Sequence, residues 1–313
     1  MRKVAFLFPG QGCQYVGMGK DLYLNSPEAR QVFDLADAQL GYALSSLCFD
    51  GSEQELTKTE NTQPAILTVS VAAYRALAAY GVRAELMAGL SLGEYSALVC
   101  SGMLEFAEAV TLVRKRGLYM QQAVSEGVGG MAAVLGLETA KVEQACEQAR
   151  TLGLVQIANY NCPGQIVISG EKKALEAAAA NAAELGARRV IPLQVSGPFH
   201  TPLLEPAAEK LAQELKSVNL KEPEIPVISN VTADIIPDPA TALQLLPEQV
   251  KSPVLWEMTI RKMLDAGVDT FVEIGPGSTL RGFVKKIDRE ANLLNVEDMA
   301  SLAKTVEFFR NHS

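Results

Sequence analysis

The chain has 313 residues and a formal net charge of −8, with 28 Lys and Arg against 36 Asp and Glu. This acidic balance is not typical of a general nucleic-acid-binding protein, because affinity for phosphates needs clustered Lys and Arg. The five scattered cysteines include no C-x-x-C pair, which argues against a disulfide framework or a zinc site and indicates a reducing, cytoplasmic environment. No apolar run reaches the about 18 residues of a membrane span.

The N-terminal region opens on a short apolar strand. Residues 4–8 form a run that Pro9 and Gly10 end, so it is too short for the apolar part of a signal peptide. A helix is expected to begin after Ser26, because serine is a favoured N-cap and Pro27 suits the first helical position. A buried strand followed by a capped helix begins an α/β pattern.

The next elements continue this pattern. A helical periodicity over residues 62–81 stops at Gly81, and residues 86–90 form a second short strand. Helices are expected at about 92–100 and 105–124.

The order of the predicted strands and helices changes after Gly129 and Gly130. About 70 residues then follow the order β-α-β-β-α-β, which is the ferredoxin-like signature. Because this unit is self-contained, we expect residues 129–195 to form a small inserted domain. Its expected strands are at 131–137, 155–161, 165–170 and 188–195, and its helices at 139–151 and 172–186.

After the insert, predicted strands again alternate with predicted helices. Strands are expected at 224–231 and 270–277 and helices at 252–267 and 278–290, the first with Ser252 and Pro253 at its start. Strands that alternate with helices predict a mostly parallel sheet that is covered on both faces.

Ser91 lies in Gly89-Leu90-Ser91-Leu92-Gly93, a G-x-S-x-G motif between a predicted strand and a predicted helix. A nucleophile elbow requires this context, because small residues on either side of the serine let strand and helix pack closely. The serine oxygen then stands at a helix N-terminus, where backbone N–H groups can stabilise an oxyanion. The motif also occurs by chance, and an N-cap serine between two packing glycines is the alternative.

Histidine usage narrows the choice of a base for Ser91. The chain has two histidines, and His312 is the penultimate residue, which leaves His200 as the candidate. From the residues alone, a structural role for His200 has equal weight. No carboxylate stands out as a third member, and the position of His200 behind an inserted domain disfavours an ordinary esterase.

Six motifs occur in order along the chain: FPGQGCQ at 8–14, GLSLGEYSA at 89–97, RKRG at 114–117, NCPGQIVISG at 161–170, GPFH at 197–200 and EIGPG at 273–277. Together they resemble the malonyl-CoA:acyl carrier protein transacylases, the acyltransferases of fatty acid and polyketide synthesis. The resemblance covers nearly the whole chain. It implies an α/β-hydrolase-like core, expected at residues 1–128 and 196–313, that carries the ferredoxin-like insert.

The resemblance also implies roles for individual residues. Ser91 would be the nucleophile and His200 its base. The backbone N–H groups of Gln11 and Leu92 would form the oxyanion hole, and losing one such donor typically costs about 10²–10³ in rate. The backbone carbonyl of Gln249 would take the place of the triad acid.

Arg116 is the residue that the resemblance assigns to the malonyl carboxylate, which a guanidinium can grip with two parallel hydrogen bonds. Helical periodicity alone does not choose between Arg114 and Arg116, which flank the apolar face of their helix on different sides. The family motif chooses Arg116, because this residue directly precedes Gly117. Arg114 and Lys115 are expected to be solvated.

Further substrate contacts follow from the same resemblance. Phe199, just before the histidine, accompanies malonyl selectivity in related domains, because its ring would crowd a C2 methyl group. Gln63 and Asn161 match positions near the acyl and pantetheine path, although turn and cap roles explain them almost as well. Family members often have histidine where this chain has Leu90, which affects only the support of the site.

The resemblance implies a ping-pong transfer of malonyl from malonyl-CoA to acyl carrier protein in fatty acid synthesis, without a metal or bound organic cofactor. The alternatives are a trans-acting polyketide acyltransferase, a thioester hydrolase that uses the same serine and histidine, and a non-catalytic carrier-binding scaffold. A monomer is expected, with no nucleic-acid or membrane partner.

Carrier docking needs local positive charge, because carrier protein is usually acidic. The candidates are Arg188 and Arg189 in the insert, together with Lys285 and Lys286 near Arg281. Ordinary solvated surface is the alternative for all of them.

Overall fold

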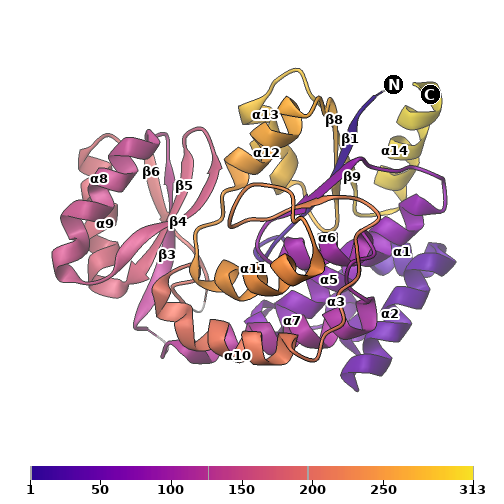
Figure 1. Cartoon of the computed structure of the whole chain (residues 1–313), viewed down its shortest axis with the longest axis horizontal. Helices are drawn as coiled ribbons and strands as arrows, with labels where there is room; N and C mark the ends of the chain where they lie inside the picture. Colours follow the sequence, from indigo (N-terminus) through magenta and orange to yellow (C-terminus); the bar gives the residue numbers. More distant parts are fainter. Residues whose placement is uncertain (1, 126, 196, 313) are drawn as a thin grey trace.

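The computed structural model describes residues 2–125, 127–195 and 197–312. Figure 1 shows a larger α/β body beside a smaller unit that carries its own sheet and helices. Ser196, where the second core segment was predicted to begin, lies outside the described residues, as do Met1, Glu126 and Ser313.

The larger body is built on a five-stranded sheet whose neighbouring strands are all parallel. On β1, Phe6 and Phe8 pack into the core on one face, whereas Ala5 and Leu7 pack into the core on the other. Burial on both faces explains why this strand is a continuous apolar run. The strand order is β7 (Val227–Ile228), β2 (Leu86–Gly89), β1 (Val4–Phe8), β8 (Thr270–Ile274) and β9 (Asn292–Val296).

Helices cover both faces of this sheet, which confirms the predicted α/β architecture with a parallel sheet. Two helices share the core with Ala5 and Leu7, namely α12 (Trp256–Asp265) and α13 (Thr279–Ile287). The helices that share the core with Phe6 are α1 (Lys20–Asn25), α2 (Pro27–Leu40), α3 (Leu44–Asp50), α4 (Glu53–Thr57), α5 (Thr59–Ala78), α6 (Leu92–Cys100), α7 (Phe106–Ala123), α10 (Glu205–Leu215), α11 (Pro239–Lys251) and α14 (Met299–Asn311).

The smaller unit has a four-stranded antiparallel sheet in the order β4-β5-β3-β6. One face of this sheet packs against its two helices around Val134 and Ile168, and the other face turns Ala133 and Val167 toward the larger body. The elements follow in the predicted order: β3 (Gly129–Leu135), α8 (Thr139–Ala149), β4 (Val155–Cys162), β5 (Gln165–Glu171), α9 (Lys172–Glu184) and β6 (Arg189–Pro192).

Several predicted elements are confirmed. Helix α2 begins after Ser26, whose Oγ accepts a hydrogen bond from Ala29 N at 3.2 Å, and Pro27 occupies the first helical turn. Helices α6 and α7 lie within a residue of their predicted limits. The strand predicted at 224–231 is wrong in extent, because the chain turns back at Ser229, whose N–H donates to Asp234 O at 2.9 Å.

The helix predicted to begin at Ser252 and Pro253 is a second correction. Helix α12 begins at Trp256, and Ser252 instead ends α11, a helix that the sequence patterns did not reveal. The intervening Val254 is extended, because its backbone pairs with β4 through Val254 N to Ala158 O at 2.8 Å and Tyr160 N to Val254 O at 2.9 Å. This pairing joins the smaller unit to the larger body.

The contact between β2 and α6 requires glycine on both sides of the turn that joins them. A Cβ on Gly93 would lie 2.1 Å from Phe8 O, and one on Gly89 would lie 1.9 Å from the carbonyl of Gly93. Neither position has room for a side chain, so the backbones of β1, β2 and α6 are in direct contact.

We therefore expect Gly93→Ala to lower the free energy of unfolding by about 1–3 kcal/mol or more, because the added methyl group forces the packed backbone apart. Gly282→Ala is the matched control, since a Cβ there meets nothing within 4 Å in helix α13. The control should be neutral or stabilising by up to about 1 kcal/mol. Urea unfolding checks both, and a Gly93→Ala protein as stable as the control would contradict this account.

Candidate active site

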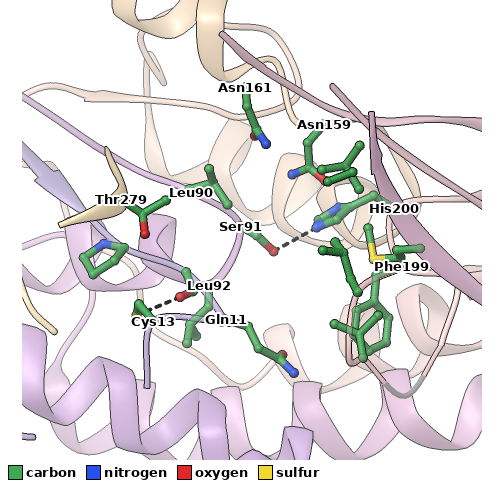
Figure 2. A pocket seen from close by; sticks show the side chains of 18 of the residues that line it. Gln11, Cys13, Leu90, Ser91, Leu92, Asn159, Asn161, Phe199, His200 and Thr279 are labelled. Atoms are coloured by element: carbon green, nitrogen blue, oxygen red, sulfur yellow. Dashed lines mark hydrogen bonds between the residues drawn. The ribbon is translucent and has the colours of Figure 1, made fainter. Parts of the chain in front are cut away.

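A cavity of about 260 Å³ opens where the carboxyl ends of β1 and β2 face the smaller sheet. Ligand sites of open parallel sheets lie at this edge. The walls come from both bodies: the loop after β1 and the β2–α6 turn on one side, and β3, β4 and β5 on the other. Figure 2 shows Ser91 and His200 pointing toward each other in this cavity, with Asn159 and Asn161 above them.

Ser91 stands at the N-cap of α6, yet its side chain makes no capping hydrogen bond. Its φ of 53° is in the left-handed region, which is the strained backbone that an elbow turn imposes. The Oγ atom lies 2.9 Å from His200 Nε2 instead. The alternative of a plain N-cap serine therefore does not describe this hydroxyl.

His200 is held from its other nitrogen by a backbone carbonyl. Nδ1 lies 2.9 Å from Gln249 O, and because a carbonyl only accepts, Nδ1 carries the proton and Nε2 is free to accept one from Ser91. Burial and then the charge of Arg116 lower the pKa of His200 to about 4. The imidazole is therefore neutral at physiological pH and can act as a base.

The two backbone N–H groups suggested for an oxyanion hole both border the cavity, since Gln11 and Leu92 line it. Within the described ranges, neither N–H donates to a backbone or side-chain acceptor. The Gln11 side chain turns away from Ser91, and its Nε2 lies 3.3 Å from Thr59 Oγ1. The two amides are thus available to an oxygen bound beside Ser91.

Arg116 is a buried cation beside the nucleophile. Only 1% of its surface is exposed, and its Nη2 lies 3.3 Å from Ser91 Oγ. Two uncharged amides hold it, through Nη1 to Gln63 Oε1 at 2.8 Å and Nη2 to Gln249 Oε1 at 2.9 Å. The guanidinium also lies over the Tyr95 ring, 5.3 Å from its centroid. Its Nε–H has no acceptor in the described structure, so the group retains donors for an anion.

Arg114 and Lys115 have different surroundings from Arg116, although they are adjacent in sequence. Both are exposed; Arg114 lies over the Tyr42 ring, and Lys115 forms an ion pair with Glu214 at 2.7 Å. Of the two arginines between which periodicity did not choose, Arg116 is the one that lines the cavity.

The remaining predicted substrate contacts take different places. Phe199 and Asn161 both line the cavity, and Asn161 Oδ1 is buried there without a hydrogen-bond partner among the described residues. Leu90 also lines it. Gln63 does not: it lies behind Arg116, and its Nε2 is 3.5 Å from Met120 Sδ.

The candidate docking residues lie in two groups at the same end of the smaller sheet, one on the β6 side of β3 and the other beside β5. Arg189 on β6 pairs with Leu135 on β3, which pairs in turn with Gln165 on β5. Lys286 of α13 then donates from Nζ to Gln165 Oε1 at 2.8 Å. Arg188, Arg189, Lys285 and Lys286 are all exposed.

Two residues of the site were missed in the sequence. Asn230, in the loop after β7, accepts from Ser91 N at 2.6 Å through Oδ1 and donates to Gly89 O at 2.7 Å through Nδ2. Glu94 on α6 is fully buried and contacts Asn230 N and Gln249 Nε2. A signal for Glu94 was present, because a carboxylate three residues after the serine falls within an otherwise apolar helix.

Two kinds of feature are absent from the described residues. No group of three His, Cys, Asp or Glu side chains within them is placed to hold a metal ion. No helix among them is both long and apolar enough to cross a membrane.

Comparison with known proteins matches this sequence and fold to an established class. Residues 5–311 match the acyl transferase domain family. The chain is 48% identical to the malonyl CoA-acyl carrier protein transacylase of Bacillus subtilis (strain 168), over 100% of this chain and 99% of that protein. The chain belongs to the family of malonyl CoA-acyl carrier protein transacylases.

Solved structures agree. A malonyl CoA-acyl carrier protein transacylase from Clostridium perfringens superposes with a TM-score of 0.95 at 49% identity, covering 99% of this chain and 98% of that one. A malonyl-transacylase in complex with a type II polyketide synthase acyl-carrier protein, PlMCAT:AntF, superposes with a TM-score of 0.96 at 42% identity, covering 98% and 99%. Both likenesses extend over the whole fold.

Proposed function

We propose that this chain transfers malonyl from malonyl-CoA to the phosphopantetheine thiol of acyl carrier protein, through a malonyl ester of Ser91, and so supplies fatty acid synthesis. The observation that carries the proposal is the buried Arg116 guanidinium, 3.3 Å from Ser91 Oγ. A malonyl group on that oxygen would bring its carboxylate to this cation. The names of the relatives support the same pair of substrates.

In the first half-reaction, Ser91 Oγ attacks the thioester carbonyl carbon while its proton passes to His200 Nε2. The developing oxyanion accepts hydrogen bonds from the N–H groups of Gln11 and Leu92. Collapse breaks the C–S bond, and His200 returns the proton to the CoA sulfur. Gln249 O stabilises the imidazolium through Nδ1, as a carboxylate does in other triads.

In the second half-reaction, the carrier thiol loses its proton to His200 Nε2 and attacks the ester carbon of malonyl-Ser91. The C–O bond breaks, and the proton returns to Ser91 Oγ. Because His200 performs both proton transfers, the assignment requires no metal or bound organic cofactor.

Selection of malonyl rests on Arg116. An acetyl group would leave the buried cation without its anion, and unpaired buried charge is costly. Phe199, 5% exposed beside His200, narrows the same cavity and would crowd a C2 methyl group. We place Asn161 along the pantetheine path, where its free Oδ1 can accept from an amide.

A polyketide carrier is a second acceptor to consider, because one superposing structure holds a type II polyketide synthase acyl-carrier protein. A thioester hydrolase would use the same Ser91 and His200 with water in place of the carrier thiol. A non-catalytic scaffold has no need of the hydrogen bond that joins these two side chains.

The organisation of the chain is part of the proposal. We assign residues 1–128 and 196–313 to an α/β-hydrolase-like core and residues 129–195 to a ferredoxin-like insert. The strand order β4-β5-β3-β6 with two helices on one face supports the insert. Because one chain supplies every group of the site, we expect it to act as a monomer, and its five unpaired cysteines support the cytosol as its compartment.

Carrier docking is assigned to the positive rim formed by Arg188, Arg189, Lys285 and Lys286. The register Arg189–Leu135–Gln165 and the bond from Lys286 to Gln165 bring the two groups together at the cavity wall, because Gln165 lines the cavity. An acidic carrier that docks there would deliver its arm directly to Ser91.

Intact-mass measurement after mixing with malonyl-CoA tests the function directly. We expect a stable mass increase of one malonyl group, which disappears when holo acyl carrier protein is added and malonyl appears on the carrier. Ser91→Ala should show no adduct. Free malonate without transfer would indicate a hydrolase, and an unmodified wild-type chain would indicate a scaffold; either would overturn the proposal.

Replacing Arg116 by Ala should cut malonyl transfer far more than acetyl transfer, because only malonyl has a carboxylate to lose its partner. Steady-state rates with malonyl-CoA and acetyl-CoA give the ratio. Arg114→Ala is the matched control, since this neighbour is exposed, and it should leave the ratio unchanged. Equal losses for both acyl groups in Arg116→Ala would refute the assignment.

Charge reversal of Arg188 and Arg189 to Glu should raise the KM for carrier protein several-fold, because the rim loses attraction for an acidic partner. Acylation by malonyl-CoA should not change. The control pair is Lys172 and Lys173, exposed cations that follow the opposite end of β5 from Gln165. An unaltered KM in the Arg188/Arg189 variant would show that this surface does not dock the carrier.

A further inference from the structure

The mechanism above makes no use of Glu94, a carboxylate in the core beneath the nucleophile. Its side chain is 0% exposed and lies on α6, three residues after Ser91. Burying a carboxylate is costly unless hydrogen bonds or a cation compensate it. The residues that stabilise the buried Glu94 carboxylate are the same residues that hold the reacting groups in place.

Glu94 Oε2 accepts two hydrogen bonds. One comes from Gln249 Nε2 at 2.9 Å, and the other from Asn230 N at 2.8 Å. Oε1 has no partner among the described residues. Both bonds therefore depend on a single oxygen, and both donors belong to residues that touch the Ser91 turn.

The Gln249 amide lies between two groups of opposite charge. Its Nε2 donates to the Glu94 carboxylate, and its Oε1 accepts from the Arg116 guanidinium at 2.9 Å. A carboxylate only accepts and a guanidinium only donates, so the amide has one possible orientation. The same residue presents its backbone carbonyl to His200 Nδ1.

Among the residues that the structure describes, no carboxylate accepts a hydrogen bond from Arg116, whose acceptors are Gln63, Gln249 and Ser91. Glu94 is the anion on the other side of the Gln249 amide, and its charge acts on Arg116. The Gln249 amide thus connects the Glu94 carboxylate and the Arg116 guanidinium, which do not contact each other directly. A hydrogen bond to an ionised acceptor is roughly twice as strong as a neutral one.

We propose that Glu94 is a positioning residue for acyl transfer: its buried negative charge fixes the Gln249 amide, and through that amide the Arg116 guanidinium and the His200 ring. This inference rests on the proposed function, because it assigns Arg116 to the malonyl carboxylate. The alternative is a structural carboxylate whose only task is to accept two N–H groups.

The ionisation of Glu94 supplies a distinct signature. Burial raises its pKa to about 7, against the lowering effects of its two hydrogen bonds and of Arg116. The ionisable groups that act on it are Arg116 from α7 and Tyr95 on α6, and His200 lies beyond Gln249. Among the elements packed against α6, β1, β2 and β7 contain no ionisable side chain, and α5 contains Glu60, Tyr74 and Arg75. As pH falls through about 7, Glu94 becomes neutral; His200, with its pKa at about 4, does not titrate there.

Glu94→Gln is the decisive variant, because it keeps the shape and an acceptor oxygen but removes the charge. We expect kcat/KM for malonyl transfer at pH 8 to fall about five- to tenfold, as a charge-assisted bond becomes neutral. The malonyl-to-acetyl ratio should fall as well, because only malonyl carries the carboxylate that Arg116 binds. The acid limb of kcat/KM near pH 7 should be present in the wild type and absent from the variant.

Glu273→Gln is the matched control. Glu273 is also fully buried and accepts two backbone N–H groups, from Leu280 at 3.1 Å and Arg281 at 2.9 Å, but at the start of α13. This variant should keep the wild-type ratio and the limb near pH 7. If Glu94→Gln keeps both as well, or loses both acyl transfers equally with the limb intact, Glu94 is merely structural and the proposal is wrong.

A measurement on the wild type covers the case in which Glu94→Gln does not fold. Of the two histidine ring signals in an NMR titration, that of His200 is assigned with a His312→Gln variant. The His200 signal should shift with a midpoint near pH 7 although the ring stays neutral, because the change in charge on Glu94 reaches the ring through Gln249. A His200 signal without a step near pH 7 would contradict the proposal. Wild-type transfer of malonyl in the same preparation tests the proposed function separately.

Discussion

The proposed nucleophile and its base both stand on strained backbone, and the rest of the site depends on this strain being held. Among the described residues, three that are not glycine have positive φ, and two of them are Ser91 at 53° and His200 at 59°. Such conformations cost on the order of 1–3 kcal/mol each and persist only where the surroundings enforce them. Here the enforcement is visible: glycine backbone packed against Phe8 on one side of Ser91, and the Asn230 side chain bonded to both Gly89 and Ser91.

Electrostatics then give this geometry its proposed chemistry. Arg116 is buried among uncharged acceptors, so its positive charge remains open to an anion. Burial and then this charge lower the pKa of His200, so the ring stays neutral. One group thereby serves selection and proton transfer together. Gln249 contacts Arg116 through its side-chain amide and His200 through its backbone carbonyl. A residue with no ionisable side chain therefore connects the selecting group to the base.

Much of the architecture could be predicted from the sequence, because local patterns determine it. Alternating strands and helices predicted the parallel sheet, and the small unit followed its predicted order. The failures have local causes too. Ser252 and Pro253 look like a helix start, but pairing of Val254 with β4 keeps this segment extended, and such pairing involves residues nearly a hundred positions apart.

The site was less accessible to local reasoning. The motif around Ser91 and the scarcity of histidine pointed to a pair, and the structure brings Ser91 and His200 together at 2.9 Å. Gln249 contacts His200 through a backbone carbonyl, which every residue has, so only resemblance singled it out. Arg116 is buried and Arg114 is exposed, a difference that helical periodicity alone did not predict. Asn230 and Glu94 contact each other across 136 residues, a distance that no spacing rule covers.

In the proposed mechanism, Ser91 carries the acyl group while Arg116 holds its carboxylate. A crystal structure of the chain trapped after reaction with malonyl-CoA would show both contacts at once. We predict an ester on Ser91 Oγ whose carboxylate lies within about 2.7–3.2 Å of two Arg116 nitrogens, with the ester oxygen facing the N–H groups of Gln11 and Leu92. A carboxylate that points to solvent, with Arg116 unengaged, would contradict it.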